Sequence, residues 1–313
     1  MQSQLPAEHN AVSGTRIASL AVGLTCAMTA CSPDGAMEEW PVPDSDIWLV
    51  EMRQEESRLT LLDPVNVTRR EGYDNQPSFL PDGSGFLYTT IRDDWQADTW
   101  QYDIRSGALR RITASLESEY SPTVMPDGEG FSTVRAEPEG IVRLWRFPME
   151  GRQPRVILRD ITGVAYHTWV DPESVALAIA RGGERLILEL VDLESGRESV
   201  LARDIGRCLH RYPGGRLLAY IDKGNPDAWL IRILDLDRGG FRGSIAARDG
   251  AEDFLVLPDG AIVMAEGRQL YIHRQGATDW ELLADYSAVL DGQITRLAAS
   301  PDGRHAALVV ESS

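Results

Sequence analysis

Cysteine is scarce in this sequence, which holds three, Cys26, Cys31 and Cys208, in 313 residues. Two of them fall in the N-terminal segment, which has the features of a removable leader followed by an anchor. Cys208 is therefore expected to be alone in the folded part, where no internal disulfide can form. A lone cysteine of this kind is usually a small buried hydrophobic residue. The scarcity excludes a small domain held together by disulfides.

Basic residues are also few, since 31 Lys and Arg face 48 Asp and Glu, which gives a formal net charge of −17. Residues 1–30 hold one acid, Glu8, and one base, Arg16, so their removal leaves this charge unchanged. A field of that sign repels phosphate backbones and anionic lipid surfaces. We therefore expect no nucleic-acid partner and no docking on a membrane through basic residues.

Long apolar runs are absent after the N-terminal region, and a chain with 43% hydrophobic and 25% charged residues is typical of a globular domain in water. The exception is residues 17–30, an uncharged stretch of apolar and small residues that follows Arg16. It is shorter than the ~20 residues of a membrane span and has the layout of a secretory signal.

The four residues that close this stretch, Met28-Thr29-Ala30-Cys31, resemble the bacterial lipobox, whose cysteine is acylated and becomes the new N-terminus. The resemblance predicts a lipoprotein signal peptide over residues 1–30 and a lipidation site at Cys31. A plain signal peptide with a chance cysteine is the alternative, and the long segment before Arg16 leaves room for a start codon downstream of Met1.

Residues 31–45 are rich in proline and acids, which predicts a short extended tether between the lipid and the folded domain. In lipoproteins of this kind, a serine after the acylated cysteine, here Ser32, favours the outer membrane. The expected location is thus the bacterial cell envelope, on the outer membrane facing the periplasm, with the lipid as the only membrane contact.

An internal repeat decides the fold. Residues 76–88 and 121–133 align without a gap, and both contain Pro-Asp-Gly. The same tripeptide recurs at Pro258 and Pro301, and degenerate copies occur at Pro172 and Pro213. The successive prolines, starting from Pro81, lie 45, 46, 41, 45 and 43 residues apart. This period is typical of one four-stranded β-propeller blade per repeat.

Each part of the repeat has a local physical reason. In x-Pro-Asp-Gly, proline presets φ at the second turn position and glycine suits the fourth, which gives a type I turn that closes a hairpin. Runs rich in β-forming residues follow at 86–91 and 99–104, and a second turn falls at 105–107. Residues 108–113 carry arginines, which suits an exposed edge strand.

The two ends of the chain complement each other. The last repeat supplies only residues 296–310, half of a blade, while residues 46–51 match 98–103 and residues 65–68 match 110–113. We therefore predict an all-β fold: a six-bladed β-propeller of four-stranded antiparallel blades over residues 46–313. The sixth blade is expected to be closed by both termini.

The repeat resembles that of TolB-type propellers, whose blades begin with Pro-x-aromatic-Ser-Pro-Asp-Gly and continue to a Trp-x-x-Asp segment. Residues 77–83 and the segment from Trp100 to Asp103 carry this resemblance. The resemblance covers residues 46–313 and is strongest in residues 77–113 and 122–158. It departs from TolB itself, which carries an α/β domain ahead of the propeller and is not normally lipidated. Propellers of this type serve as protein docking rings, as accessory domains of peptidases and occasionally as lyases.

Two enzyme classes with propellers lack support. Propeller-bearing prolyl peptidases need a serine-hydrolase domain, and no Gly-x-Ser-x-Gly elbow occurs in the sequence. Calcium-dependent lactonases line their channel with asparagines and acids, but only Asn75 of the four asparagines falls where a channel residue is expected.

The segments that lead into the innermost strands are expected to face the channel mouth. Side chains there that break the repeat are the candidate binding residues, because scaffold demands are the same in every blade. They are Tyr73, Asp74, Asn75, Glu119, Tyr120, His167, His210 and Asp253. We expect Glu119 and Asp253 to be loop carboxylates that contribute little to stability.

His167 and His210 occupy similar places in adjacent blades and could supply half of a metal site, which acids or Gln293 would have to complete. TolB-like oligogalacturonate lyases, by this resemblance, bind a metal through channel histidines. A pectin fragment, however, would meet an acidic protein here. The leading hypothesis is a non-catalytic envelope lipoprotein, with no cofactor, that binds a protein or peptide partner at the channel mouth. The alternative is a metal-assisted propeller enzyme, of the lyase or lactonase type, acting on a saccharide or lactone.

Overall fold

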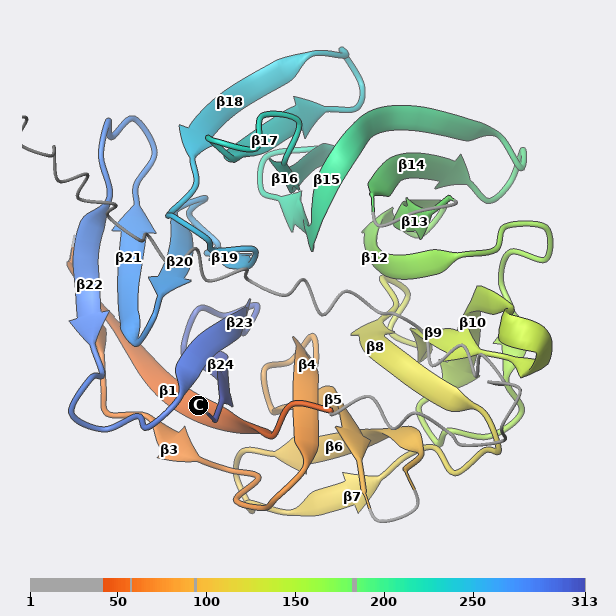
Figure 1. Cartoon of the computed structure of the whole chain (residues 1–313), viewed down its shortest axis with the longest axis horizontal. Helices are drawn as coiled ribbons and strands as arrows, with labels where there is room; N and C mark the ends of the chain where they lie inside the picture. Colours follow the sequence, from red (N-terminus) through yellow and green to blue (C-terminus); the bar gives the residue numbers. More distant parts are fainter. Residues whose placement is uncertain (1–41, 57, 93–94, 182–184, 313) are drawn as a thin grey trace, which may run out of the picture.

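The computed structural model describes residues 42–56, 58–92, 95–181 and 185–312. These form a ring of antiparallel β-sheet units around a central axis, with one short 3-10 helix, η1 (Pro138–Gly140) (Figure 1). The predicted signal peptide, the lipidation site Cys31 and most of the tether lie outside this part of the chain. Within it, no helix is long and apolar enough to cross a membrane.

The first three blades follow one another in the chain. Blade 1 contains β4 (Tyr73–Phe79), β5 (Gly85–Ile91), β6 (Ala97–Asp103) and β7 (Leu109–Arg111). Blade 2 contains β8 (Ser118–Val124), β9 (Gly130–Ala136), β10 (Val142–Pro148) and β11 (Arg155–Val156). Blade 3 contains β12 (Val164–Asp171), β13 (Ser174–Ala180), β14 (Leu186–Asp192) and the first half of β15 (Glu198–Tyr212).

The second half of β15 begins blade 4, which continues with β16 (Leu217–Asp222), β17 (Leu230–Asp235) and β18 (Phe241–Ala246). Ile205 is the joint, since it pairs both with Leu186 of blade 3 and with Asp222 of blade 4. Blade 5 contains β19 (Phe254–Val256), β20 (Ile262–Glu266), β21 (Gln269–His273) and β22 (Glu281–Asp285).

Blade 6 is assembled from both ends of the described chain, as the sequence predicts. Its inner strands are β23 (Gln293–Ala299) and β24 (His305–Glu311), and its outer strands are β1 (Ser45–Glu55), β2 (Arg58–Leu61) and β3 (Val65–Asn66). Strand β1 pairs with β24 over seven residue pairs, from Ser45 with Glu311 to Glu51 with His305. The all-β, six-bladed fold with a sixth blade closed by both termini is thereby confirmed.

The Pro-Asp-Gly turns form as the sequence predicts. The glycine N–H donates to the carbonyl three residues earlier at 2.8–2.9 Å in four of them: Gly83 to Leu80, Gly128 to Met125, Gly260 to Leu257 and Gly303 to Ser300. A further glycine opens the next strand in blades 1 and 2. A Cβ at Gly85 or Gly130 would lie 2.1–2.2 Å from a carbonyl oxygen of the third strand, so only glycine fits.

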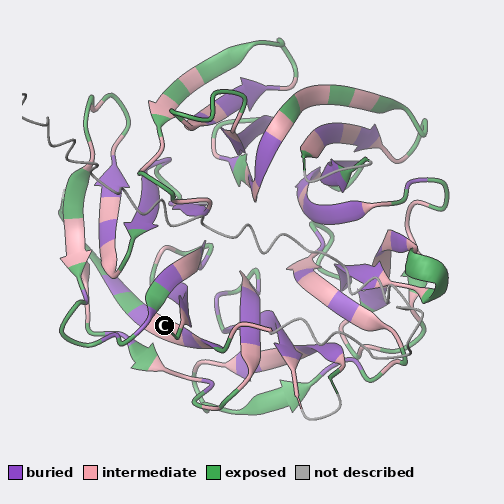
Figure 2. Cartoon of the chain, viewed as in Figure 1, coloured by how far each residue is buried: buried purple, intermediate pink, exposed green. Residues whose placement is uncertain are grey.

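Burial differs between the strands of a blade, and in blade 1 the outermost strand is the most exposed. The second strand of a blade is the most buried, and in both β5 and β9 every residue but the last is buried. The outermost strand of blade 1, β7, is exposed along its whole length and carries Arg110 and Arg111, as expected for an edge strand. Figure 2 shows the same gradient around the ring.

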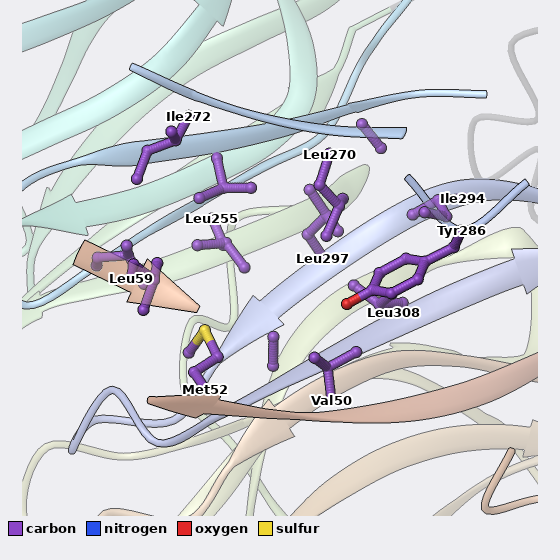
Figure 3. Close-up of a cluster of buried hydrophobic side chains, with 14 of the residues drawn as sticks. Val50, Met52, Leu59, Leu255, Leu270, Ile272, Tyr286, Ile294, Leu297 and Leu308 are labelled. Carbon is purple, nitrogen blue, oxygen red and sulfur yellow. The ribbon is translucent and has the colours of Figure 1, made fainter. Parts of the chain in front are cut away.

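Apolar side chains between blades form the core. One cluster joins blade 6 to blade 5 and contains Val50 and Met52 from β1, Leu59 from β2 and Leu308 from β24 (Figure 3). The single described cysteine, Cys208, is free and buried in the cluster between blades 4 and 5, as predicted. Burial raises the pKa of its thiol well above the usual range, so Cys208 is an inert core residue.

Candidate binding site in the central channel

The innermost strands carry the side chains that the sequence predicts at the channel mouth. Strand β4 holds Tyr73, Asp74 and Asn75, β8 holds Glu119 and Tyr120, β12 holds His167 and β15 holds His210, while Asp253 directly precedes β19. The Pro-Asp-Gly turns connect the far ends of these strands to their neighbours. We call the face where β4, β8 and β23 begin the mouth face, and the opposite one the turn face.

A β-bulge interrupts five of the six innermost strands. The register shifts lie between Asn75 and Ser78, Tyr120 and Thr123, Val164 and Tyr166, Ile205 and Leu209, and Ile294 and Arg296. In blades 1 and 2 the bulges contain Gln76 and Ser121, with φ of 58° and 51°. The Ser121 N–H donates to Gln76 Oε1 at 2.7 Å, which ties the two bulges together. Bulges re-aim side chains, here toward the channel.

Two cavities lie in the channel. The mouth cavity, about 360 Å³, is lined by residues of blades 1, 4, 5 and 6 and by Pro43. The channel cavity, about 270 Å³, is lined by the innermost strands of all six blades. Both cavities are lined by Arg207, Asp253 and Arg296, which we call the neck.

The predicted residues divide into three groups. Tyr73, Asn75 and Asp253 line the mouth cavity, and His167, His210 and Asp253 line the channel cavity. Tyr120 is half-buried and lines neither of these two cavities. Asp74 and Glu119 are fully buried inside their blades and also line neither.

The sequence predicts that Glu119 and Asp253 are loop carboxylates. Asp253 does lie in the connection before β19, but Glu119 lies in β8, and both are buried, at 8% and 0% exposed. The Glu119 carboxylate accepts a hydrogen bond from Ser115 Oγ and lies 3.4 Å from Arg135 Nε. The equivalent residue of blade 1, Asp74, pairs with Arg70 at 2.9 Å. These carboxylates hold the mouth-face ends of their blades together.

A pH dependence follows for Glu119. Burial raises its pKa to about 7, against the opposing hydrogen bond from Ser115 and the charge of Arg135. A folded-state pKa above the unfolded value means that stability falls as pH rises between these two values. From the ordinary value of 4.5 to about 7 the loss is about 3 kcal/mol, at roughly 1.4 kcal/mol per unit. The variant Glu119→Gln is expected to lack this loss.

The measurement is urea unfolding of parent and variant at pH 5, 6, 7 and 8. The parent is expected to lose stability relative to Glu119→Gln as pH rises, whereas the exposed control Glu129→Gln is expected to follow the parent at every pH. A constant difference between parent and Glu119→Gln would show that Glu119 does not titrate in this range.

The neck places two arginines around one carboxylate. Asp253 Oδ1 accepts a hydrogen bond from the Leu297 N–H at 2.9 Å, and Oδ2 lies 3.8 Å from Arg296 Nη1. The Arg296 guanidinium lies 5.2 Å from the ring centre of Tyr166. Burial raises the pKa of Asp253, while the charges of Arg296 and Arg207 oppose this rise.

Two titratable side chains near the neck, Tyr73 and His210, are uncharged at pH 7. Burial raises the pKa of the Tyr73 hydroxyl, and burial lowers the pKa of His210. The His210 ring packs edge-on against Phe254, with ring centres 5.1 Å apart. The charge of the neck is therefore set by Arg207, Arg296 and Asp253.

The two neck arginines are not among the residues that the sequence singles out for the site. Arg207 lies in the segment that enters the innermost strand of blade 4, so its position alone was a usable signal. Arg296 faces the channel because a bulge follows Ile294, and no sequence pattern marks that bulge.

A metal site built on His167 and His210 does not fit this geometry. His167 Nε2 lies 2.6 Å from Ser132 Oγ, and burial lowers the pKa of the ring to about 3. No group of three or more His, Cys, Asp or Glu side chains that could hold a metal ion occurs among the described residues. Ser132 is fully buried and also accepts from Trp169 Nε1, so the Ser132–His167 pair offers no accessible nucleophile.

Comparison with known proteins places the fold. No family model and no curated protein matches the sequence. A structure assigned to TolB of Agrobacterium tumefaciens matches with a TM-score of 0.65 and 16% identity, over 87% of this chain and 100% of that one. TolB of Acinetobacter baumannii matches with a TM-score of 0.56 and 17% identity, over 86% of this chain and 64% of that one.

An oligogalacturonate lyase in complex with manganese also matches, with a TM-score of 0.50 and 14% identity, over 88% of this chain and 99% of that one. The class defined by these likenesses is the β-propeller. Within that class the chain is similar to the propellers of TolB, and at such low identity the likeness shows the fold alone.

Proposed function

We propose that this chain is a non-catalytic binding protein of the bacterial cell envelope that captures a protein or peptide segment at its mouth cavity. The observation that carries the proposal is the mouth cavity of about 360 Å³, where side chains of four blades converge on one opening. A ligand there contacts several blades at once, whereas the outer strands contact none of it.

The charges around the opening favour a polar or basic partner segment. Four acids line the mouth cavity away from the neck: Asp249, Glu252, Glu266 and Glu311. Lys223 pairs with Glu252, and Arg248 pairs with Glu266. Asp249 is exposed, as is Gln293, which also lines the mouth cavity.

Two exposed apolar side chains lie on the same face. Trp95, in the β5–β6 connection, is 64% exposed, and Leu116, in the β7–β8 connection, is 94% exposed. Gln96 Nε2 donates to Ser118 Oγ at 3.1 Å, so the two connections lie side by side. Exposed aromatic side chains are common anchors in protein interfaces, and this pair supports a protein partner that extends past the cavity.

Added positive charge at the mouth tests this proposal. The double variant Asp249→Arg with Gln293→Arg is expected to weaken partner capture at least tenfold, because it places two cations at an acidic opening without touching the core. Crosslinking in cells followed by affinity purification measures the captured partner. Glu129→Arg, a comparable change at an exposed residue of the turn face, is the matched control and is expected to capture normally. Normal capture by the double variant would move the binding site away from the mouth.

The anchor belongs to the same proposal. Pro43 lines the mouth cavity, so the tether enters the ring on the mouth face. The twelve residues 31–42 reach at most about 40 Å when fully extended. A lipid on Cys31 would therefore keep the mouth close to the membrane surface, where envelope partners are found.

Loss of the anchor has an all-or-none readout. Cys31→Ser is expected to abolish incorporation of radioactive palmitate and to release the protein from the membrane fraction, because the proposed lipid is attached through the Cys31 thiol. Cys208→Ser is the matched control and is expected to keep both the label and the membrane association. Palmitate labelling that persists in Cys31→Ser would refute the lipoprotein assignment.

A further inference from the structure

Two arginines from different blades meet at the neck. Arg207 comes from the bulge of β15 in blade 4, and Arg296 comes from the bulge of β23 in blade 6. Arg207 Nη2 donates to the carbonyl oxygen of Thr295 at 2.5 Å, so its guanidinium is held against the strand that carries Arg296. Both side chains line the mouth cavity and the channel cavity.

The positive charge at the neck is only partly compensated. Asp253 is the one carboxylate there, and one of its oxygens is already bonded to the Leu297 N–H. Arg207 has no ion-pair partner within the described ranges, and its buried Nε has no hydrogen-bond partner there. Arg207 as a whole is half-buried, and a buried polar atom without a partner, such as its Nε, is costly.

We propose that the neck is a subsite for a carboxylate group of the captured segment. Arg207 and Arg296 would donate charge-assisted hydrogen bonds to the carboxylate oxygens, a geometry for which guanidinium groups are well suited. The inference rests on the proposed function and narrows its ligand. The ligand carries a carboxylate at its leading end, in the cationic neck, and neutral or basic residues behind it, at the acidic opening.

A carboxylate can come from a peptide C-terminus or from an Asp or Glu side chain. The experiment measures fluorescence anisotropy of three fluorescein-labelled peptides with the full chain. The first is Gly-Lys-Ser-Lys-Ala-Ala with a free C-terminus, the second is its C-terminal amide, and the third is the amide with Glu in the last position. The free acid is expected to bind at least tenfold more tightly than the amide. If the Glu-containing amide binds as tightly as the free acid, the subsite accepts both a side-chain and a C-terminal carboxylate. If it binds as weakly as the Ala amide, the subsite is specific for a C-terminus.

Two variants test the role of Arg207. Arg207→Gln removes the charge and is expected to erase the preference for the free acid, while Arg207→Lys retains part of it. Arg110→Gln, on the exposed outer strand of blade 1, is the matched control and is expected to keep the full preference. If Arg207→Gln does not fold, the role of Arg207 is judged from the ratio of the affinities for the free acid and the amide, compared between the parent and Arg207→Lys.

Equal binding of the free acid and the amide, or no binding of either up to 1 mM, overturns the carboxylate subsite. Neither result tests capture at the mouth. That proposal is tested by measuring capture of the envelope partner by the double variant Asp249→Arg with Gln293→Arg. Loss of capture in that variant, together with equal binding of the two peptides, would leave the proposed function standing and remove the carboxylate from it.

Discussion

Deletion of residues 46–68 is expected to abolish cooperative unfolding of the ring. The deletion removes β1, one of the two strands that pair with β24, and takes Ile47, Val50, Met52 and Leu59 out of the core. At roughly 2 kcal/mol for each buried apolar side chain, these four contribute about 8 kcal/mol. Typical domains are stable by only about 5–15 kcal/mol, so the remainder is not expected to hold a native state.

The measurement is urea unfolding followed by tryptophan fluorescence and by circular dichroism. The deletion variant is expected to aggregate or to unfold without a sharp transition, because the apolar faces of blades 5 and 6 shown in Figure 3 become exposed. Arg53→Ser with Glu55→Ser changes only exposed side chains of the same strand and is expected to unfold like the parent. A deletion variant that unfolds like the parent would contradict a blade built from both termini.

The variant Asp253→Ala is expected to lose about 3 kcal/mol of stability at pH 7, because removing one member of a buried ion pair leaves an uncompensated buried charge. Here both Arg207 and Arg296 would remain in the neck, and the Leu297 N–H would lose its acceptor. An exposed loop carboxylate would change the free energy of unfolding only slightly.

Urea unfolding at pH 7 measures the change. Asp249→Ala is the matched control, since Asp249 is exposed only four residues earlier and its loss is expected to change the stability by less than about 0.5 kcal/mol. Equal stabilities of the two variants would show that Asp253 carries no structural charge pair. Acetate is expected to restore part of the stability of Asp253→Ala if the neck accepts a carboxylate.

The fold could be predicted from the sequence because a propeller repeats its local physics. Pro81 and Pro126 stand at turns of the same type, and Gly85 and Gly130 stand where a Cβ would strike the next strand. Each of these demands fixes a residue type at a regular spacing. The match of residues 46–51 to 98–103 then identified the missing strand of the sixth blade, which pairs as expected.

The sequence could predict where the site lies, but not which side chains face the channel. Segments that enter the innermost strands do line the cavities, but which side chain faces the channel depends on the bulges. A shift of one residue reverses the side on which every following side chain lies. Asp74 and Glu119 therefore point into their blades, and Arg296 points into the channel, although nothing in the local sequence distinguishes these cases.

The sequence also could not predict which groups the charged side chains of the neck contact. Arg207 contacts Thr295, 88 residues away, and Asp253 accepts from Leu297, 44 residues away. These contacts join blade 4 to blade 6 and blade 5 to blade 6, so they exist only in the assembled fold. Sequence reasoning treats each blade alone, so it predicts loop carboxylates at Glu119 and Asp253 and gives Arg296 no place in the channel.

Photo-crosslinking from single positions tests capture at the mouth most directly. Benzoylphenylalanine is placed in cells at position 293 on the mouth face and, separately, at position 129 on the turn face and at position 110 on the outer edge. Capture at the mouth predicts a partner adduct from position 293 and none from positions 129 and 110. Adducts from position 129 or 110, with none from position 293, would contradict it.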